Sequence, residues 1–358
     1  MQKANNFFRQ WAVGCLCVTA FCLGTMTNAV AAAEKTTLSY LSWADYIDPD
    51  LVKDFEKKFD VIVKEVYFET DEEREQKLAY TDGKGYDVVL VGGLFVSSYV
   101  KRGWVTPMDF SKMPTIKNID PRWRKAFPQA ETNAVPYFWG TLGIAYRKDL
   151  VPENIHSWQQ FFRPAPAFLG KIGMLNDSSE AIGMALMSLK NSRNNTDAKA
   201  LAEAEKLLLS QRPYVKTYST PILTNKSPLV TGELWMSMFY NGDALTLQKF
   251  SPQIEYVVPE EGGGLWVDYL MVLQSSKQKD LAMAFINFLN EPENAARLAS
   301  YLNYASPNEA AKKFLSAEHL NNPVIYPSHE IVSRSEFAEK MPPRSDRDRN
   351  LVFSNVKK

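Results

Sequence analysis

One short stretch, Tyr86 to Val91, constrains the fold of this chain more than any other. Its last four residues, Val88 to Val91, are all apolar, so both faces of such a strand must be covered by other elements. It lies between helices predicted over residues 71–80 and 95–101. Strands that alternate with helices in this way are typical of a mostly parallel sheet with helices on both faces. We therefore expect an α/β fold.

The elements before this strand agree with that expectation. A β-prone run covers residues 36–41, and a second strand is predicted over residues 61–68. Between them, Asp48 and Pro49 are the N-cap and the first helical position of a helix. Apolar residues follow at helical spacing, so this helix should lay one face on a core. These residues are Leu51, Val52, Phe55 and Phe59.

A change of pattern at Val135–Gly140 predicts a second domain. This extended aromatic piece reads as a crossing into another α/β unit over residues 171–258, and the strand predicted over 265–273 returns to the first sheet. We expect two α/β lobes with a ligand cleft between them, where the carboxyl ends of strands meet. The expected bounds are 34–138 plus about 268–318 for lobe 1, and 139–267 plus about 319–358 for lobe 2.

The first 33 residues have the pattern of a bacterial secretory signal peptide. Lys3 and Arg9 precede an apolar run from Trp11 to about Leu23, and small residues follow with cleavage sites ending at Ala31 or Ala33. We therefore expect residues 1–33 to be removed and the mature protein to lie in the periplasm. All three cysteines lie in this signal, which leaves the mature chain without disulfides or thiolate metal sites.

Charge and size restrict the classes of partner. The chain has 41 basic and 41 acidic residues, so removal of Lys3 and Arg9 leaves a net charge of minus two. Neither this balance nor any basic run favours nucleic acid as a partner. The aromatic content of 12% is more than a core of this size requires.

The stretch from Glu261 to Leu270 contains a candidate site for an organic cation. Three glycines form a turn, and the alternation after it predicts a strand in which Trp266 and Asp268 share one face. An aromatic ring beside a carboxylate attracts a cation through both cation–π and charge interactions. The alternative is a buried Trp next to a turn-adjacent Asp without a ligand.

A second acidic pair, Asp177 and Glu180, follows the strand predicted over residues 171–175. The spacing Asp-x-x-Glu is that of a capping box, in which both side chains satisfy free amide groups of the next helix. The other interpretation has both carboxylates directed into the cleft to hold an ammonium group. Asp177 can do both, whereas for Glu180 the two roles compete.

Enzymatic interpretations find little support in the sequence. His156, His319 and His329 are scattered without partners at metal-ligand spacing. The glycines at 262–264 do not open a helix, which excludes the dinucleotide fingerprint, and no nucleophile motif is present. We expect a protein that is not an enzyme and needs no cofactor or metal.

Seven motifs, taken together, give the chain a family resemblance. They lie between about Thr36 and Phe337, and they are Trp43-Ala44-Asp45-Tyr46, Tyr86-Asp87-Val88-Val89, Val135-Pro136-Tyr137-Phe138-Trp139-Gly140, Asp177-Ser178-Ser179-Glu180, Tyr240-Asn241-Gly242, Trp266-Val267-Asp268 and Tyr304-Ala305-Ser306-Pro307-Asn308. In the order and spacing of these motifs the chain resembles the periplasmic spermidine/putrescine-binding proteins of bacterial polyamine uptake systems.

The resemblance implies the bilobal periplasmic binding protein fold and a specific set of cleft residues. Aromatic plates hold the methylene chain of the polyamine in this family, and carboxylates hold its amines. The implied plates are Trp43, Tyr46, Tyr240, Trp266 and Tyr304. The implied anions are Asp177, Glu180 and Asp268.

The sequence also departs from the family pattern. Gly92 and Leu94 stand where the family often has a Ser and a Tyr, Tyr240 stands for a common Trp, and Ala338 for a Gln of some members. These departures resemble the branch that senses norspermidine and signals to an inner-membrane cyclic-di-GMP enzyme, which controls biofilm formation. The alternative is the substrate-binding subunit of an ABC-type spermidine/putrescine uptake system.

The expected partners follow from these two functions. They are a linear polyamine of three or four amines, and either the periplasmic domain of an inner-membrane receptor or an ABC permease. We expect the protein itself to be a monomer.

Overall fold

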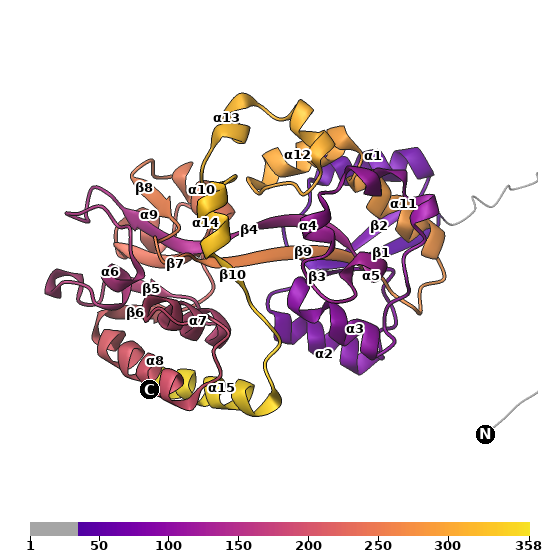
Figure 1. Cartoon of the computed structure of the whole chain (residues 1–358). Coiled ribbons are helices and arrows are strands. Elements are labelled where there is room, and N and C mark those ends of the chain that lie inside the picture. Colours follow the sequence, from indigo (N-terminus) through magenta and orange to yellow (C-terminus); the bar gives the residue numbers. More distant parts are fainter. Residues whose placement is uncertain (1–34) are drawn as a thin grey trace, which may run out of the picture. The chain divides into compact units, whose positions relative to one another are not determined.

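Strands and helices alternate along the chain in the computed structural model, which describes residues 35–358 (Figure 1). The predicted signal peptide and the three cysteines lie outside the described residues. The strands are β1 (Thr37–Trp43), β2 (Ile62–Phe68), β3 (Val88–Gly92), β4 (Val135–Arg147), β5 (Ile172–Met174), β6 (Val215–Tyr218), β7 (Met236–Tyr240), β8 (Ile254–Val257), β9 (Gly264–Val272) and β10 (Glu336–Phe337).

Helices connect and flank these strands. The longer ones are α1 (Pro49–Phe59), α2 (Asp71–Thr81), α7 (Ser178–Ser188), α8 (Ala198–Gln211), α10 (Asn241–Gln248), α11 (Lys279–Leu289), α12 (Pro292–Leu302) and α15 (Pro343–Lys357). The shorter ones are α3 (Val96–Lys101), α4 (Pro121–Arg124), α5 (Ala130–Asn133), α6 (Trp158–Phe162), α9 (Pro228–Thr231), α13 (Ala317–Asn321) and α14 (His329–Arg334). Within residues 35–358, every helix falls short of the length and apolarity that crossing a bilayer requires.

The strands form two parallel groups joined by two long antiparallel strands. Along the sheet the order is β2-β1-β3-β9-β4-β7-β5-β6, with β10 on β9 and β8 on β4. Pairing is parallel within β2-β1-β3 and within β7-β5-β6, as predicted. The strands β4 and β9 pair with each other antiparallel and run from one group to the other (Figure 1).

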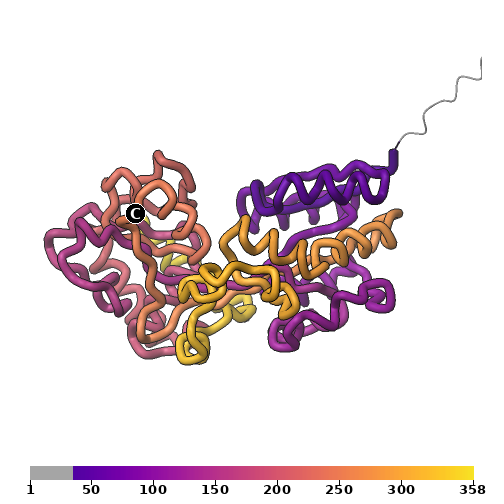
Figure 2. Tube along the Cα trace, turned by 90° about the horizontal axis from the view of Figure 1, so that it is seen from above, coloured from indigo at the N-terminus to yellow at the C-terminus, as the bar shows by residue number. Residues whose placement is uncertain are grey.

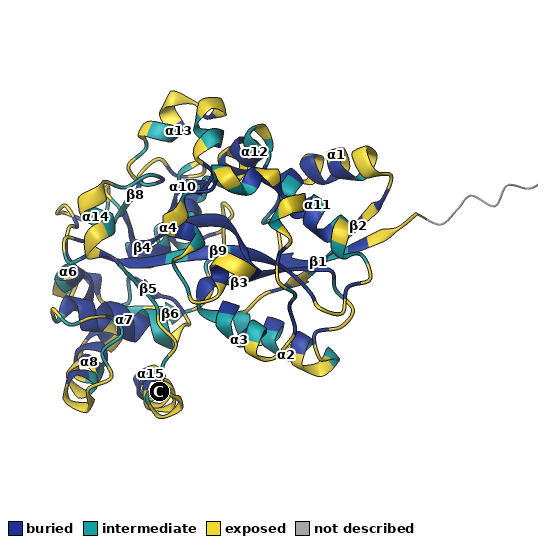
Figure 3. Cartoon of the chain, turned by 45° about the vertical axis from the view of Figure 1, so that its right-hand side comes forward, coloured by how far each residue is buried: buried dark blue, intermediate teal, exposed yellow. Residues whose placement is uncertain are grey.

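This arrangement differs in one respect from two lobes with separate sheets. The hydrogen-bond ladder is continuous, because the predicted crossings at 135–140 and 262–268 belong to the paired strands β4 and β9. Both strands are buried along most of their length (Figure 3). The chain therefore crosses between lobes through a shared two-stranded ladder rather than through loops.

The first core is the buried interior of the strand group β2-β1-β3, and it covers both faces of β1 and β3. Side chains of β3 alternate between its two faces: Val88 and Leu90 pack with α1, α11 and α12, while Val89 and Val91 pack with α2 and α3. The Asp48 carboxylate caps α1 by accepting a 2.9 Å hydrogen bond from the amide of Asp50. The prediction that the apolar strand is covered on both faces is confirmed.

The second core forms around β5 and β7 with α7, α8 and α15. It includes Ile172 and Met238 from the strands, and Val352, Phe353 and Val356 from α15. Figure 2 shows the indigo segments of the first group and the magenta segments of the second, with later orange and yellow segments between them. The two cores give the chain a bilobal α/β fold.

Three elements of the structure were not expected from the sequence. The charged segment after Pro342 forms the helix α15, and Glu309–Phe314 is a 3₁₀ helix. The short strand β6 is the third. Ile325, which follows the predicted lobe 1 segment at about 268–318, packs in the first core.

We expect Gly262→Ala to destabilise the protein by about 1–3 kcal/mol. Gly262 has a φ of +97°, and a Cβ there would lie 2.1 Å from the carbonyl oxygen of Arg334. Its own carbonyl accepts a 2.7 Å hydrogen bond from the Trp158 indole, so the turn cannot move freely. Thermal or urea unfolding measures the loss.

The matched control for this substitution is Gly85→Ala. Gly85 has a φ of +90°, but a Cβ there would meet no atom within 4 Å. The control therefore carries the backbone strain of a positive φ without the collision with Arg334. Equal losses for the two variants would contradict the claim that the Gly262 turn is locked against the segment at Arg334.

Candidate ligand-binding site

The strand β9 presents Trp266 and Asp268 on one face, as the alternation predicts. Both side chains are only partly buried, whereas Val267 and Tyr269 between and beside them are buried. Asp268 accepts a 3.0 Å hydrogen bond from the Tyr46 hydroxyl, although 222 residues separate the two in the sequence. The structure thus brings together this carboxylate and one of the predicted aromatic plates.

Aromatic rings form a wall beside Asp268. Trp266 lies edge-on to Tyr304, with ring centroids 4.9 Å apart, and edge-on to Tyr240 at 6.2 Å. Tyr46 in turn meets Tyr304 at 6.0 Å. Tyr240 packs against the second core, while Trp266, Tyr46 and Tyr304 belong to the first. The wall therefore stands where the two cores meet.

The structure adds Asp243, which the sequence analysis missed. It lies in the first turn of α10 and accepts a 2.8 Å hydrogen bond from the Tyr304 hydroxyl. A carboxylate at a helix N-terminus is favoured by the helix dipole. Its position just after β7 was the available signal, since Asp177 follows β5 in the same way.

A bulge in β4 directs two further aromatic residues toward the wall. The register of β4 against β9 shifts between Pro136 and Trp139. Tyr137, inside the bulge, donates a 3.0 Å hydrogen bond to the carbonyl of Tyr46, and Phe138 lies 6.0 Å from the Tyr46 ring. Bulges commonly re-aim side chains near binding sites. Both residues belong to a motif of the family resemblance but were not singled out as site residues.

Asp177 and Glu180 lie at the N-terminus of α7, but only half of the capping box is made. The Asp177 carboxylate accepts a 3.0 Å hydrogen bond from the amide of Glu180 and so caps the helix. The carboxylate of Glu180 instead accepts a 2.8 Å hydrogen bond from the guanidinium of Arg193. Neither of the two roles considered for Glu180 describes this contact.

The charges of this acidic pair act on Tyr240 of the aromatic wall. Burial raises the pKa of Tyr240 well above its ordinary value, and the charges of Glu180 and Asp177 raise it further. Tyr240 also contacts Trp266, so it lies between the acidic pair of α7 and the part of the wall beside Asp268. Direct contacts therefore join five of the predicted residues, and the charges of Asp177 and Glu180 act on one of them, Tyr240. The five are Tyr46, Tyr240, Trp266, Asp268 and Tyr304.

Trp43 and Glu180 are the two predicted residues with other principal contacts. The Trp43 ring packs on Phe68, with centroids 4.5 Å apart and an interplanar angle of 59°. It is partly exposed and lies along both faces of the first core. Glu180 faces Arg193, as described above.

Two carboxyl groups of the site have strongly raised pKa values. Burial raises the pKa of Asp268 to about 7, against the lowering effect of the Tyr46 hydrogen bond. Burial, followed by the charge of Glu180, raises the pKa of Asp177 to about 7. Asp177 keeps an exposed surface, so water stabilises its charged form more than that of Asp268. Asp71, at the start of α2, adds to both rises.

A third carboxyl group, Asp243, has a pKa raised by burial to about 6, although the Tyr304 hydroxyl stabilises its charged form. A buried carboxylate without a cation is costly, and an ammonium group placed beside it would offset that cost. Raised pKa values in a cluster are therefore what a cation-binding site should show before its ligand arrives.

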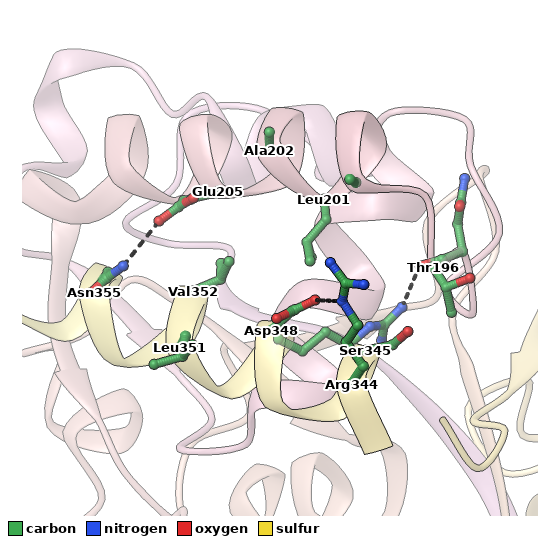
Figure 4. Close-up of a pocket in the computed structure, with 13 residues that line it drawn as sticks. Thr196, Leu201, Ala202, Glu205, Arg344, Ser345, Asp348, Leu351, Val352 and Asn355 are labelled. Carbon is green, nitrogen blue, oxygen red and sulfur yellow. Dashed lines mark hydrogen bonds and ion pairs between the residues drawn. The ribbon is translucent and has the colours of Figure 1, made fainter. Parts of the chain in front are cut away.

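The larger of two described cavities does not lie at this cluster. It has a volume of about 560 Å³ and lies between α8 and α15, with lining residues such as Leu201, Arg344 and Val352 (Figure 4). The other, of about 160 Å³, is lined by Trp123, Trp139 and neighbours. Neither lining includes any of the eight predicted residues, so the site rests on its contacts and charges.

A bilobal α/β fold with side chains of both cores meeting between them is the architecture of a solute-binding protein. The profile of the bacterial extracellular solute-binding proteins matches residues 50–324. The chain belongs to this family, which consists of solute-binding proteins and not of enzymes. The resemblance that the sequence motifs indicated is confirmed.

Relatives and solved structures agree with this assignment. The spermidine/putrescine-binding periplasmic protein of Escherichia coli K12 is 32% identical over 332 residues, which are 92% of this chain and 93% of that protein. The norspermidine sensor of Vibrio cholerae is 33% identical over 325 residues, 90% and 89% of the two chains.

Among solved structures, the spermidine/putrescine ABC transporter substrate-binding protein of Streptococcus pneumoniae superposes with a TM-score of 0.81. It is 28% identical, and the match covers 90% of this chain and 99% of that one.

Proposed function

We propose that the protein is a periplasmic polyamine-binding protein of the norspermidine/spermidine class. The observation that carries the proposal is the pairing of Asp268 with the aromatic wall of Trp266, Tyr304 and Tyr46. A polyamine carries ammonium groups, which need carboxylates, on a methylene chain, which packs well on aromatic faces. Amino acids and sugars need an Arg or a set of amide donors instead.

The polyamine lies, in this proposal, between the carboxylates at the two sides of the wall. Asp268 comes from the first core side and Asp177 from the second, and each would receive one ammonium group. Tyr46, Tyr240, Trp266 and Tyr304 contact the methylenes, with Trp43 at the edge. We place the lobe bounds near 34–138 plus 268–318, and 139–267 plus 319–358, so that the ligand closes the lobes on each other.

Ligand class is tested by thermal shift across a panel of compounds. A ligand that binds only the folded state raises the melting temperature as its concentration exceeds the dissociation constant. Norspermidine and spermidine should raise it most and putrescine less, while glutamate and maltose should leave it unchanged. A shift with glutamate or maltose alone would contradict the proposal.

We further propose that the protein acts as a sensor, whose ligand state an inner-membrane cyclic-di-GMP enzyme reads through its periplasmic domain. The departures at Gly92, Leu94 and Ala338 and the 33% identity to the norspermidine sensor support it. The second candidate is the substrate-binding subunit of an ABC uptake system, supported by the 32% identity to the Escherichia coli protein. Both functions use the same cleft and need a partner that distinguishes open from closed protein.

Gene deletion separates the two candidates. If the protein is a sensor, deletion of its gene should change biofilm mass or cyclic-di-GMP level and leave uptake of radiolabelled spermidine nearly intact. Lost uptake, with biofilm responding only as internal polyamine falls, would assign the protein to transport. The Asp268→Asn variant serves as the control, since it should fail to restore either phenotype when reintroduced.

A further inference from the structure

Arg193 forms an ion pair with Glu180, one of the carboxylates predicted to bind the ligand. Its guanidinium Nη2 lies 2.8 Å from Oε2 of Glu180. The Arg193 side chain is 1% exposed and that of Glu180 is 15% exposed. A pair so enclosed is not a surface ion pair that water screens. The pair lies at the N-terminus of α7.

Two glycines make the space through which Arg193 reaches Glu180. A Cβ on Gly264, at the start of β9, would lie 2.6 Å from Arg193 Nη1 and 3.3 Å from Glu180 Oε2. A Cβ on Gly183, one turn along α7 from Glu180, would lie 3.3 Å from the Arg193 Nε. Any side chain at Gly264 would collide with the ion pair. Glycines in β9 and α7 therefore leave the space that the guanidinium of Arg193 fills.

The backbone of Arg193 is fixed as well. Its amide donates a 3.2 Å hydrogen bond to Glu336 Oε2, and its carbonyl accepts a 2.6 Å hydrogen bond from Nη2 of the buried Arg349. Ser192 Oγ donates to the same oxygen of Glu336 at 2.5 Å. A ligand amine that took Glu180 from Arg193 would leave a buried guanidinium without its carboxylate, which is strongly unfavourable.

The other two carboxylates predicted to bind the ligand, Asp177 and Asp268, differ from Glu180 in the charge of their hydrogen-bond partners. Among the hydrogen bonds and ion pairs between described residues, Asp268 is contacted by the Tyr46 hydroxyl and Asp177 by the amide of Glu180. Both are neutral donors. Asp243 likewise accepts from a neutral donor, the Tyr304 hydroxyl. Of the site's carboxylates, Glu180 is therefore the one that already has a charged partner among the described residues.

We propose that Arg193 is a specificity-determining residue, which neutralises Glu180 so that Asp177 alone receives the ligand's ammonium group at the α7 end of the cleft. This inference rests on the proposed polyamine function. Its consequence concerns discrimination between ligands. An additional ammonium near Glu180 gains little affinity, so longer polyamines lose the advantage that a free second carboxylate would give them.

A charge-matched double variant, Glu180→Gln with Arg193→Gln, tests this inference. It removes the ion pair without changing net charge, and the two amides can still hydrogen-bond to each other. Spermidine affinity, measured by calorimetry at pH 8, should stay within about threefold of the unaltered protein. Asp268→Asn, run beside it, should lose about tenfold or more, since a charge-assisted contact is removed.

The single variant Arg193→Gln provides a second measurement if the double variant does not fold. It frees Glu180, so spermidine affinity should rise about tenfold, with a smaller rise for the diamine putrescine. A tenfold loss in the double variant, or no gain in the single variant, would overturn the inference. Failure of the unaltered protein to bind any polyamine would remove the proposed function itself, and this inference with it.

Discussion

Replacing Asp268 with Asn is expected to lower polyamine affinity by about ten- to a hundredfold. The substitution keeps the shape of the side chain, and the amide oxygen can still accept the hydrogen bond from the Tyr46 hydroxyl. It removes the charge that an ammonium group would meet. Calorimetry on protein freed of copurified ligand gives the dissociation constant directly.

The same substitution should not destabilise the ligand-free protein. Burial raises the pKa of Asp268 to about 7, so the charged carboxylate is unfavourable in the empty cleft at neutral pH. A neutral amide removes that penalty, and the melting temperature should hold or increase. Asp280→Asn, an exposed carboxylate next to Lys112, is the matched control and should leave affinity unchanged. Binding by Asp268→Asn within twofold of the unaltered protein would contradict the assignment.

Polyamine affinity is expected to fall about tenfold between pH 8 and pH 6. With a pKa of about 7 in the empty cleft, Asp268 is mostly ionised at pH 8 and mostly protonated at pH 6. An alkyl ammonium, like that of lysine with a pKa of about 10, stays charged over this range. Binding at pH 6 must therefore release a proton from Asp268, which weakens it.

The proton release can be measured by calorimetry in buffers that differ in their heat of ionisation. Asp177, whose pKa is also raised to about 7, should add to the effect. In Asp268→Asn the decrease from pH 8 to pH 6 should be smaller, since one of the titrating carboxyl groups is gone. Affinity that is flat, or that rises as the pH falls, would contradict the raised pKa values as part of binding.

Local patterns were sufficient for most of the fold. The Asp48-Pro49 cap begins α1, and the period-two alternation after the glycine turn gives β9 with Trp266 and Asp268 on one face. These features depend on residues close together in the chain. The continuous sheet depends on pairing between β4 and β9, more than a hundred residues apart, which no local pattern specifies.

The helix α15 has apolar residues at helical spacing, but its many charged residues made this pattern hard to recognise. Val352, Phe353 and Val356 have helical spacing and pack in the second core, but charged residues surround them in the sequence. A single buried stripe on a polar helix is easily missed when mean polarity is weighed first. The partner of Glu180 had no such signal. Arg193 lies in a loop, and its direction depends on Gly183 and Gly264 in two other elements.

The candidate site also contains residues that the sequence predicted and residues that it did not. The motif positions of the family gave most of the residues that gather around the wall. Tyr46 and Asp177 follow strand ends, whereas Trp266 and Asp268 lie within β9, where period-two alternation predicted their shared face. Asp243, Tyr137 and Phe138 were missed, since the first requires the Tyr304 contact to be known and the other two the bulge in β4.

Calorimetric titration of the mature, ligand-free protein with norspermidine and spermidine tests the central claim most directly. We predict saturable binding of one polyamine per protein molecule, weaker binding of putrescine, and no heat beyond dilution with glutamate or maltose. Binding of an anion or a sugar, with no response to any of the three polyamines, would contradict the account.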